Sequence, residues 1–188
     1  MSEEKWIPNK FEKEEQICIE KFISFSKLAI MKKYFVITAE TQYGTMCDTV
    51  SINKTGGTVV AELKYRDKKA TGYTDCYIEI SKYENLLKLY EKGCLPLYLN
   101  FIGDKYYLWV IPTICSGLKK YKKVHIKSSI SGMKYVDRYG LKWQDAWIFD
   151  KEGNIIQESK CIEAPDPPKK HNINFNKAIN NKVLNNLK

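Results

Sequence analysis

Apolar residues recur at two spacings along the first 112 residues of the chain. Between Phe11 and Lys33 the spacing is helical, with apolar side chains at Cys18, Phe22, Phe25 and Ala29, and this pattern predicts a first helix. Runs of alternating and β-branched residues predict strands. The predicted strands cover residues 34–39, 47–53, 58–66, 95–103 and 105–114.

A second helix is predicted between the third and fourth strands, over residues 81–93. Ser81 is a candidate N-cap, Glu84 has the spacing of a capping box, and Gly93 is a stop signal. The element order is then α-β-β-β-α-β-β. This order predicts an α/β domain with a mixed, mostly antiparallel central sheet flanked by helices.

The pattern after residue 112 is harder to interpret. A further hairpin is expected over residues 146–157, and the proline-rich residues 164–172 are typical of a linker. Phe175, Ile179, Val183 and Leu187 form one helical stripe in the tail. We therefore expect a single domain over residues 1–163, with its core at 11–112 and a basic part at 113–163. Residues 164–188 are expected to form the linker and a short amphipathic tail.

The positive charge of the chain lies mostly in its second part. The formal net charge is +9, and residues 113–188 hold 15 of the 31 Lys and Arg residues but only 7 of the 22 Asp and Glu residues. The basic residues are densest at "LKKYKKVHIK". Such a positive charge favours binding of a polyanion, and nucleic acid is the first candidate. The alternative is that the lysines serve only to keep the protein soluble. The candidate phosphate-binding lysines here are Lys119, Lys120, Lys122 and Lys123.

Composition excludes several classes of site. With only His125 and His171, the chain is a poor candidate for Ser–His–Asp hydrolysis or a histidine-rich metal site. The six cysteines are scattered without a C-x₂-C pair, which indicates reduced thiols and a cytoplasmic protein. No apolar run approaches the roughly 18–20 residues of a membrane span. The polar N-terminus does not resemble a secretory signal.

Three charges stand out in the hairpin formed by the second and third predicted strands. A turn centred on Thr55 would pair Val50 with Val60, so Asp48 would face Glu62, with Lys64 on the same side. Two opposed carboxylates repel, and a divalent cation between them reverses the sign of that energy. Mg²⁺ accepts such ligands, and a nearby lysine can position a water. The alternative is a water-exposed strand face that alternates Glu and Lys.

Asp48 and the Glu62-Leu63-Lys64 triplet, set between two predicted helices, resemble the motif of the PD-(D/E)XK nuclease superfamily. The resemblance covers residues 11–112. It implies that Asp48 and Glu62 bind Mg²⁺, or Mn²⁺ in its place, together with the Leu63 carbonyl, and that Lys64 is the catalytic lysine. Cys47 stands where the motif name has proline.

The same resemblance implies a wider set of residues. Many members add an acid from the first helix, for which Glu20 is the best candidate and Glu14 and Glu15 are rivals. Some use a polar residue of the second helix, here Lys82, which could also contact nucleic acid. Arg66, Lys68 and Lys69 continue the strand and could contact phosphates, although surface solvation explains them equally well.

These observations predict a metal-dependent deoxyribonuclease with a restriction-endonuclease-like core. By the resemblance, its products would carry a 5′-phosphate and a 3′-hydroxyl. The alternative is a non-catalytic nucleic-acid-binding or assembly protein that keeps the fold. RNA in place of DNA and a homodimer are left open, and no membrane partner is expected.

Overall fold

A computed structural model describes residues 10–41, 46–66, 68–128, 132–161 and 179–184. Within these residues the chain forms two α-helices, α1 (Lys10–Ser26) and α2 (Ile80–Glu91), and three short 3₁₀ helices. The 3₁₀ helices are η1 (Lys68–Gly72), η2 (Ile111–Thr113) and η3 (Trp143–Asp145). The strands are β1 (Ile37–Thr41), β2 (Thr49–Ile52), β3 (Thr58–Arg66), β4 (Asp75–Glu79), β5 (Leu95–Ile102), β6 (Lys105–Val110), β7 (Lys119–Ser128), β8 (Gly132–Lys142), β9 (Trp147–Asp150), β10 (Ile155–Gln157) and β11 (Ile179–Leu184).

The strands form one large sheet and one small sheet. The large sheet has the order β10-β9-β6-β5-β3-β2-β1-β11, and the small sheet has the order β4-β8-β7. Only β3 and β5 pair in parallel in the large sheet. Parallel neighbours need a long crossover, and here η1, β4 and α2 provide it. The predicted α/β class with a mixed, mostly antiparallel sheet is confirmed.

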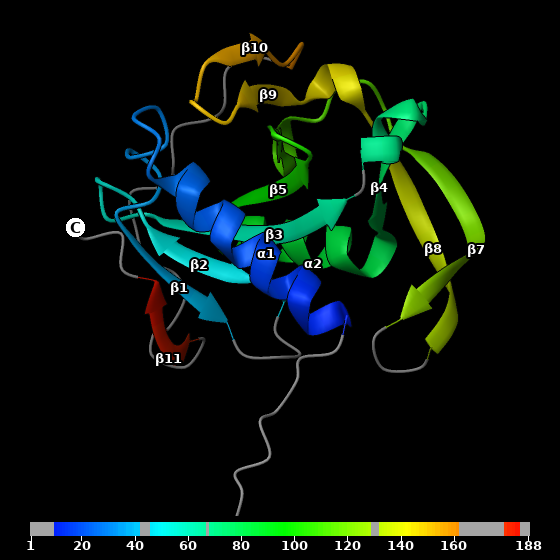
Figure 1. The fold of residues 1–188 in the computed structure, drawn as a ribbon, viewed down its shortest axis with the longest axis horizontal. Helices are drawn as coiled ribbons and strands as arrows, with labels where there is room; N and C mark the ends of the chain where they lie inside the picture. The colour runs from blue at the N-terminus through cyan, green and yellow to red at the C-terminus, as the bar shows by residue number, and fades with distance from the viewer. Residues whose placement is uncertain (1–9, 42–45, 67, 129–131, 162–178, 185–188) are drawn as a thin grey trace, which may run out of the picture.

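The two helices cover opposite faces of the large sheet (Figure 1). On one face, Phe22 and Phe25 of α1 pack on alternate residues of β3 and β5, among them Leu63 and Leu99. On the other face, Leu86 of α2 packs in a second cluster. This second cluster also contains Val60, Tyr98 and Trp109. Side chains alternate across a strand, so neighbouring residues of β3 serve different cores.

The hairpin of β2 and β3 agrees with the sequence prediction. Val50 pairs with Val60, and Ile52 pairs with Thr58. Gly56 has a φ of 81°, which glycine adopts without strain. The Asn53 side chain accepts hydrogen bonds from the Gly57 and Thr55 backbone N–H groups, each at 2.8 Å. The turn therefore fixes the register that leads towards Asp48 and Glu62, but the strand pairing ends at Thr49 and Ala61, one position before the predicted pair of acids.

Both helices differ from their predicted bounds. Helix α1 ends at Ser26 rather than Lys33, and Ala29 is exposed beyond it. Helix α2 begins at Ile80, one residue earlier than expected, and Glu79 takes the N-cap position without a side-chain cap bond. The predicted capping box is therefore wrong, because the strand that precedes the helix sets its start. Gly93 follows the helix with a φ of 85°, as its stop signal predicts.

The second part of the chain adds strands to both sheets. Strands β7 and β8 form the small sheet with β4, and the predicted hairpin β9–β10 extends the large sheet beside β6. Strand β11 pairs with β1, so the helical expectation is wrong for Ile179–Leu184. Asparagines are poor helix formers, and the edge of β1 offers backbone partners. Phe175, Leu187 and residues 164–172 lie outside the described residues.

Neither helix in the described residues is long and apolar enough to span a membrane.

Candidate active site

Asp48 lies where strands β2 and β3 separate, beyond the pair Thr49 and Ala61, and this point is called the fork. The pairing of the two strands ends at Thr49 and Ala61, just after a bond of 2.9 Å from the Asp48 N–H to the Ala61 carbonyl. Among the described residues, strand β3 continues beyond this point without a strand partner on this edge, while its other edge stays paired with β5 as far as Arg66. The Leu63 N–H at the fork donates to the Asp48 carboxylate at 2.7 Å. A side chain thus replaces the missing strand partner.

Glu62 lies beside this fork in a buried environment. It is 3% exposed, and its Oε1 atom lies 2.5 Å from the Lys82 amine on α2. Its other oxygen, Oε2, is buried without a hydrogen-bond partner among the described residues. Burial, followed by the charge of Asp48, raises the pKa of Glu62 to about 7. A buried carboxylate with one unsatisfied oxygen is costly, so this atom is available to a ligand.

Two lysines flank the pair of acids. Burial alone would lower the pKa of Lys82, but the charges of Glu62 and Asp48 raise it above its usual value. Lys64 is exposed on the same face of β3 as Glu62, and its charge lowers the pKa of Glu62 in part. The structure therefore brings Asp48, Glu62, Lys64 and Lys82 into electrostatic contact.

The Leu63 backbone contributes a further group at the fork. In a strand, the N–H and C=O of one residue point to the same edge. The Leu63 N–H points to Asp48, so the Leu63 carbonyl faces the edge that β2 has left. Two carboxylates and a carbonyl are the hard oxygen ligands that Mg²⁺ takes together with water. These residues, with the unsatisfied Oε2 of Glu62, fit such an ion.

The acids of α1 lie on two faces of the helix. Glu20 is exposed and accepts a hydrogen bond of 3.1 Å from Gln16. By helical geometry it points away from Cys18, whereas Glu14 and Glu15 share the face of Cys18. Cys18 is buried, and its pKa is raised by burial and by the charge of Asp48. The α1 face nearest the fork therefore carries Glu14 and Glu15, not Glu20.

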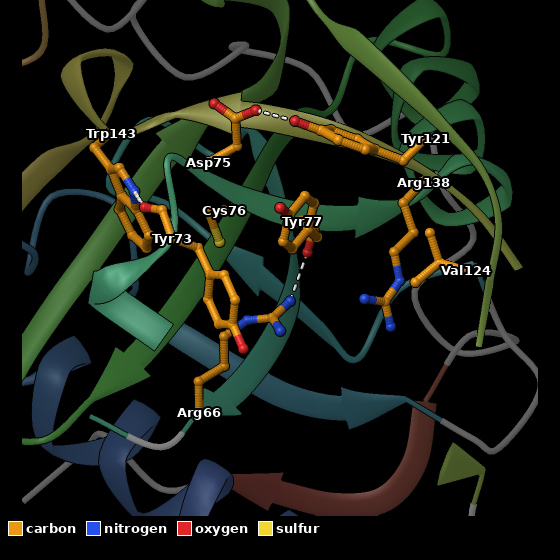
Figure 2. Close-up of a pocket in the computed structure, with 9 residues that line it drawn as sticks. All are labelled: Arg66, Tyr73, Asp75, Cys76, Tyr77, Tyr121, Val124, Arg138 and Trp143. Carbon is orange, nitrogen blue, oxygen red and sulfur yellow. Dashed lines mark hydrogen bonds between the residues drawn. The ribbon is translucent and has the colours of Figure 1, made fainter. Parts of the chain in front are cut away.

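The remaining predicted residues lie elsewhere. Arg66 enters a pocket between β3 and the small sheet (Figure 2), and Lys69 is exposed in η1. The other exposed candidates are Lys119, Lys120 and Lys122 on β7. The side chains of Lys68 and Lys123 lie outside the described part of the chain.

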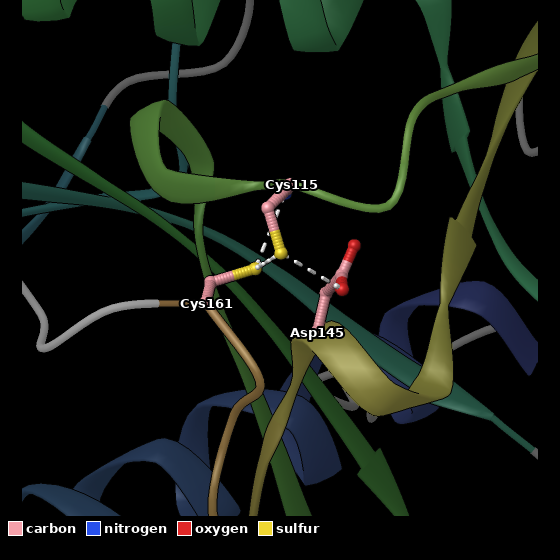
Figure 3. Close-up of side chains that lie close together, drawn as sticks. All are labelled: Cys115, Asp145 and Cys161. Atoms are coloured by element: carbon pink, nitrogen blue, oxygen red, sulfur yellow. Dashed lines mark hydrogen bonds between the residues drawn. The ribbon is translucent and has the colours of Figure 1, made fainter.

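A cluster that the sequence analysis missed contains Cys115, Asp145 and Cys161 (Figure 3). In the described residues it is the only group of three or more His, Cys, Asp or Glu side chains with metal-ligand proximity. The two sulfur atoms lie 2.8 Å apart. The cysteines are 46 positions apart in the chain, so no local spacing signals them.

The chemistry of this cluster does not suit magnesium. Thiolates prefer zinc and other soft ions. Burial raises the pKa of Cys161 to about 12, so its thiol stays protonated near neutral pH. The Asp145 carboxylate already accepts hydrogen bonds from the backbone N–H and the hydroxyl of Ser116. Its first role is therefore to fix the loop after η2.

No protein-family model and no curated protein sequence matches the chain.

Proposed function

We propose that this protein is a metal-dependent deoxyribonuclease of the PD-(D/E)XK type. The observation that carries the proposal is the state of Glu62. It is buried beside a second acid, it has a pKa of about 7, and it keeps one oxygen without a partner in the described residues. Two neighbouring acids and an unsatisfied buried oxygen cost free energy, and a metal ion at Oε2 would offset the part of that cost that Lys82 leaves.

Each residue of the fork has a distinct role in this proposal. Asp48, Glu62 through Oε2, and the Leu63 carbonyl hold the ion, and the Leu63 N–H fixes the orientation of Asp48. Held there, Mg²⁺ would polarise the scissile phosphate and lower the pKa of a water. Lys64 positions the attacking water and offsets the negative charge that develops on the phosphate. Lys82 pairs with Oε1 of Glu62, and its charge favours the ionised form of Glu62, which partly offsets the rise in pKa caused by burial and by Asp48.

The Lys82–Glu62 ion pair also supports the alternative of a non-catalytic DNA-binding protein. The amine is itself a cation, 2.5 Å from the carboxylate, and could serve as a permanent substitute for the metal. In that case the chain would bind DNA without cutting it. Metal binding separates the two functions.

The test is a cleavage assay with Mg²⁺ and with Mn²⁺ on linear, circular, single-stranded and branched DNA. The wild-type chain is expected to cut at least one of these substrates. Lys64→Ala should reduce the rate by about 10²-fold or more, because a group that stabilises the transition state is lost. Lys54→Ala is the matched control, since Lys54 is exposed in the turn at the other end of the same hairpin.

Calorimetric titration with Mn²⁺ provides a readout that does not depend on activity. The wild type should bind, and Asp48→Asn and Glu62→Gln should each bind at least about tenfold more weakly. Wild-type protein that neither binds Mn²⁺ nor cuts any of the substrates would reject the nuclease proposal in favour of the non-catalytic alternative.

A further inference from the structure

A second concave site lies on the same side of β3 as the proposed active site. Glu62, Lys64 and Arg66 alternate along the strand, so their side chains share one face. Arg66 is four residues beyond Glu62, about 13 Å along an extended strand. Beyond it, β3 and the small sheet enclose a pocket of about 480 Å³. This volume suits a small molecule or one unit of a polymer.

Both arginines of the chain line this pocket. The sequence contains 31 basic residues, and Arg66 and Arg138 are the only arginines among them. Figure 2 shows their side chains on either side of Tyr77. Arginine presents a planar fork of donors that matches phosphate and stacks on aromatic rings, which lysine does not. All other basic residues except two histidines are lysines, so the presence of both arginines in one pocket indicates a site that needs the planar donor group of arginine.

In the part of the chain that the structure describes, no ion pair with an acid balances the charge of Arg66. Arg66 donates hydrogen bonds to neutral acceptors, at 2.6 Å to the Asn100 side chain, 3.0 Å to the Tyr98 hydroxyl and 2.5 Å to the Tyr77 carbonyl. Burial, followed by the charge of Arg66, lowers the pKa of Arg138. Glu79 lies opposite Arg138 in the pairing of β4 and β8 and offsets part of its charge. An anion between the two guanidinium groups would stabilise both.

The acid in the pocket wall is already engaged. Asp75 is 1% exposed and accepts hydrogen bonds of 2.6 Å from the Tyr121 hydroxyl and from the Lys142 amine. Gly140 makes room for this arrangement, because a Cβ atom there would lie 2.7 Å from the Asp75 carboxylate and 2.9 Å from the Tyr121 ring. Asp75 therefore orients Tyr121 and does not neutralise the arginines.

Aromatic rings form the remaining wall. The rings of Tyr77 and Tyr121 meet edge to face at 5.2 Å, and those of Tyr73 and Tyr77 at 6.2 Å. Tyr73 is 59% exposed, so its ring is open to a stacking partner. Trp143 fixes the Tyr73 backbone through a hydrogen bond of 2.7 Å from its indole N–H to the Tyr73 carbonyl. Exposed rings beside basic groups are the elements that bind unpaired nucleotides.

We propose that this pocket binds one unpaired nucleotide of the DNA strand that is cut at the fork. The phosphate would lie between Arg66 and Arg138, and the base would stack on Tyr73. This proposal rests on the nuclease function for its choice of ligand. The pocket would hold the strand in place while the scissile phosphate lies at Glu62 and Lys64, and it predicts a preference for DNA with a single-stranded segment.

The test uses the full-length Lys64→Ala protein with EDTA, so that neither cleavage nor metal contributes. Thymidine 5′-monophosphate, thymidine and inorganic phosphate are titrated separately and followed by calorimetry. The monophosphate is expected to bind in the millimolar range, and thymidine and phosphate alone should each bind more weakly. Arg138→Gln should weaken monophosphate binding about tenfold or more, because a charge-assisted contact is lost. Lys151→Gln, at an exposed lysine of the β9–β10 turn, is the charge-matched control.

Tyr73→Ala separates stacking from charge. Because Tyr73 is largely exposed, this variant should keep its melting temperature even where Arg138→Gln does not. It should weaken binding of the monophosphate but leave binding of inorganic phosphate unchanged. Equal affinity for phosphate and monophosphate, or a monophosphate affinity that neither variant changes, would overturn the nucleotide assignment. Monophosphate binding together with a wild-type chain that cuts no DNA in the presence of metal would reject the nuclease function while the pocket stands, and wild-type cleavage without monophosphate binding would reject the pocket alone.

Discussion

The fork and the pocket each hold two like charges, but they neutralise them in different ways. At the fork, the charge of one acid raises the pKa of the other, and Lys82 supplies an internal cation to one oxygen of Glu62. In the pocket, the hydrogen bonds of Arg66 go to neutral atoms, and the buried acid in the wall is occupied by Tyr121 and Lys142. At the fork, the chain itself therefore supplies a cation to one of the two Glu62 oxygens and leaves the other without a partner in the described residues. The pocket depends more on a ligand from outside.

The largest expected effect is at the fork. Glu62→Gln removes the carboxylate with the unsatisfied oxygen, so cleavage should fall by about 10³-fold, since both metal affinity and charge stabilisation are lost. Single-turnover cleavage at saturating DNA measures this effect. Glu84→Gln, at an exposed position on α2, is the control. If Glu62→Gln kept an activity within a few fold of wild type, the active site would lie elsewhere than at the fork.

The second prediction separates the two arginines of the pocket. Arg66→Gln should lower the free energy of unfolding by about 2–3 kcal/mol, because it leaves buried acceptors without their donor. Arg138→Gln should change it by less than about 1 kcal/mol, since Arg138 is less deeply buried than Arg66. Urea denaturation measures both values. Equal losses would mean that Arg138 is as much a part of the core as Arg66 and is not reserved for a ligand.

The third prediction concerns pH in the absence of metal. Glu62 titrates near 4.5 in the unfolded chain and near 7 in the folded protein. Between these values the folded state binds more protons at Glu62, so the contribution of Glu62 to stability is highest below about pH 4.5 and falls as pH rises towards 7. We expect Glu62 to cause a loss of about 1–3 kcal/mol across this window.

Urea titrations of wild type and Glu62→Gln at several pH values isolate this contribution. The variant should lose less stability across the window, and saturating Mg²⁺ should reverse the loss in wild type, because the ion binds the deprotonated acid. A wild-type profile that matches that of Glu62→Gln would show that Lys82 alone compensates the charge. The fork would then be closed to a metal.

The sequence predicted the fork better than the pocket, because the residues of the fork are close together in the sequence and those of the pocket are far apart. Asp48 and Glu62 belong to one hairpin, so the turn at Thr55 and the period of two place them together. Arg66, Tyr121 and Arg138 come from three strands of two sheets, and β7 and β8 have no clear alternation. Lys82 was predicted in part: the pattern predicted helix α2, but it did not predict which face of that helix lies against Glu62.

The smallest expected effect concerns the basic strand β7, which borders the pocket. Adjacent residues of a strand point to opposite faces, so Lys119 and Tyr121 share the face that Lys120 does not. The Lys119 amine lies 5.0 Å from the centre of the Tyr121 ring, whereas the Lys120 amine lies 3.9 Å from the Asp137 carboxylate. Lys119 is therefore nearer to the proposed nucleotide than Lys120, whose amine pairs with Asp137.

Lys119→Ala should therefore flatten the slope of log K against log salt by up to about 0.7, the value for one lost phosphate contact on single-stranded DNA. Lys120→Ala should change the slope less, because Asp137 already screens that amine. Fluorescence anisotropy at several salt concentrations in the Lys64→Ala background measures both slopes without cleavage. Equal changes from the two variants would mean that DNA contacts both faces of β7. An unchanged slope in both would place the strand outside the DNA path and leave Arg66 and Arg138 as the phosphate contacts on this side.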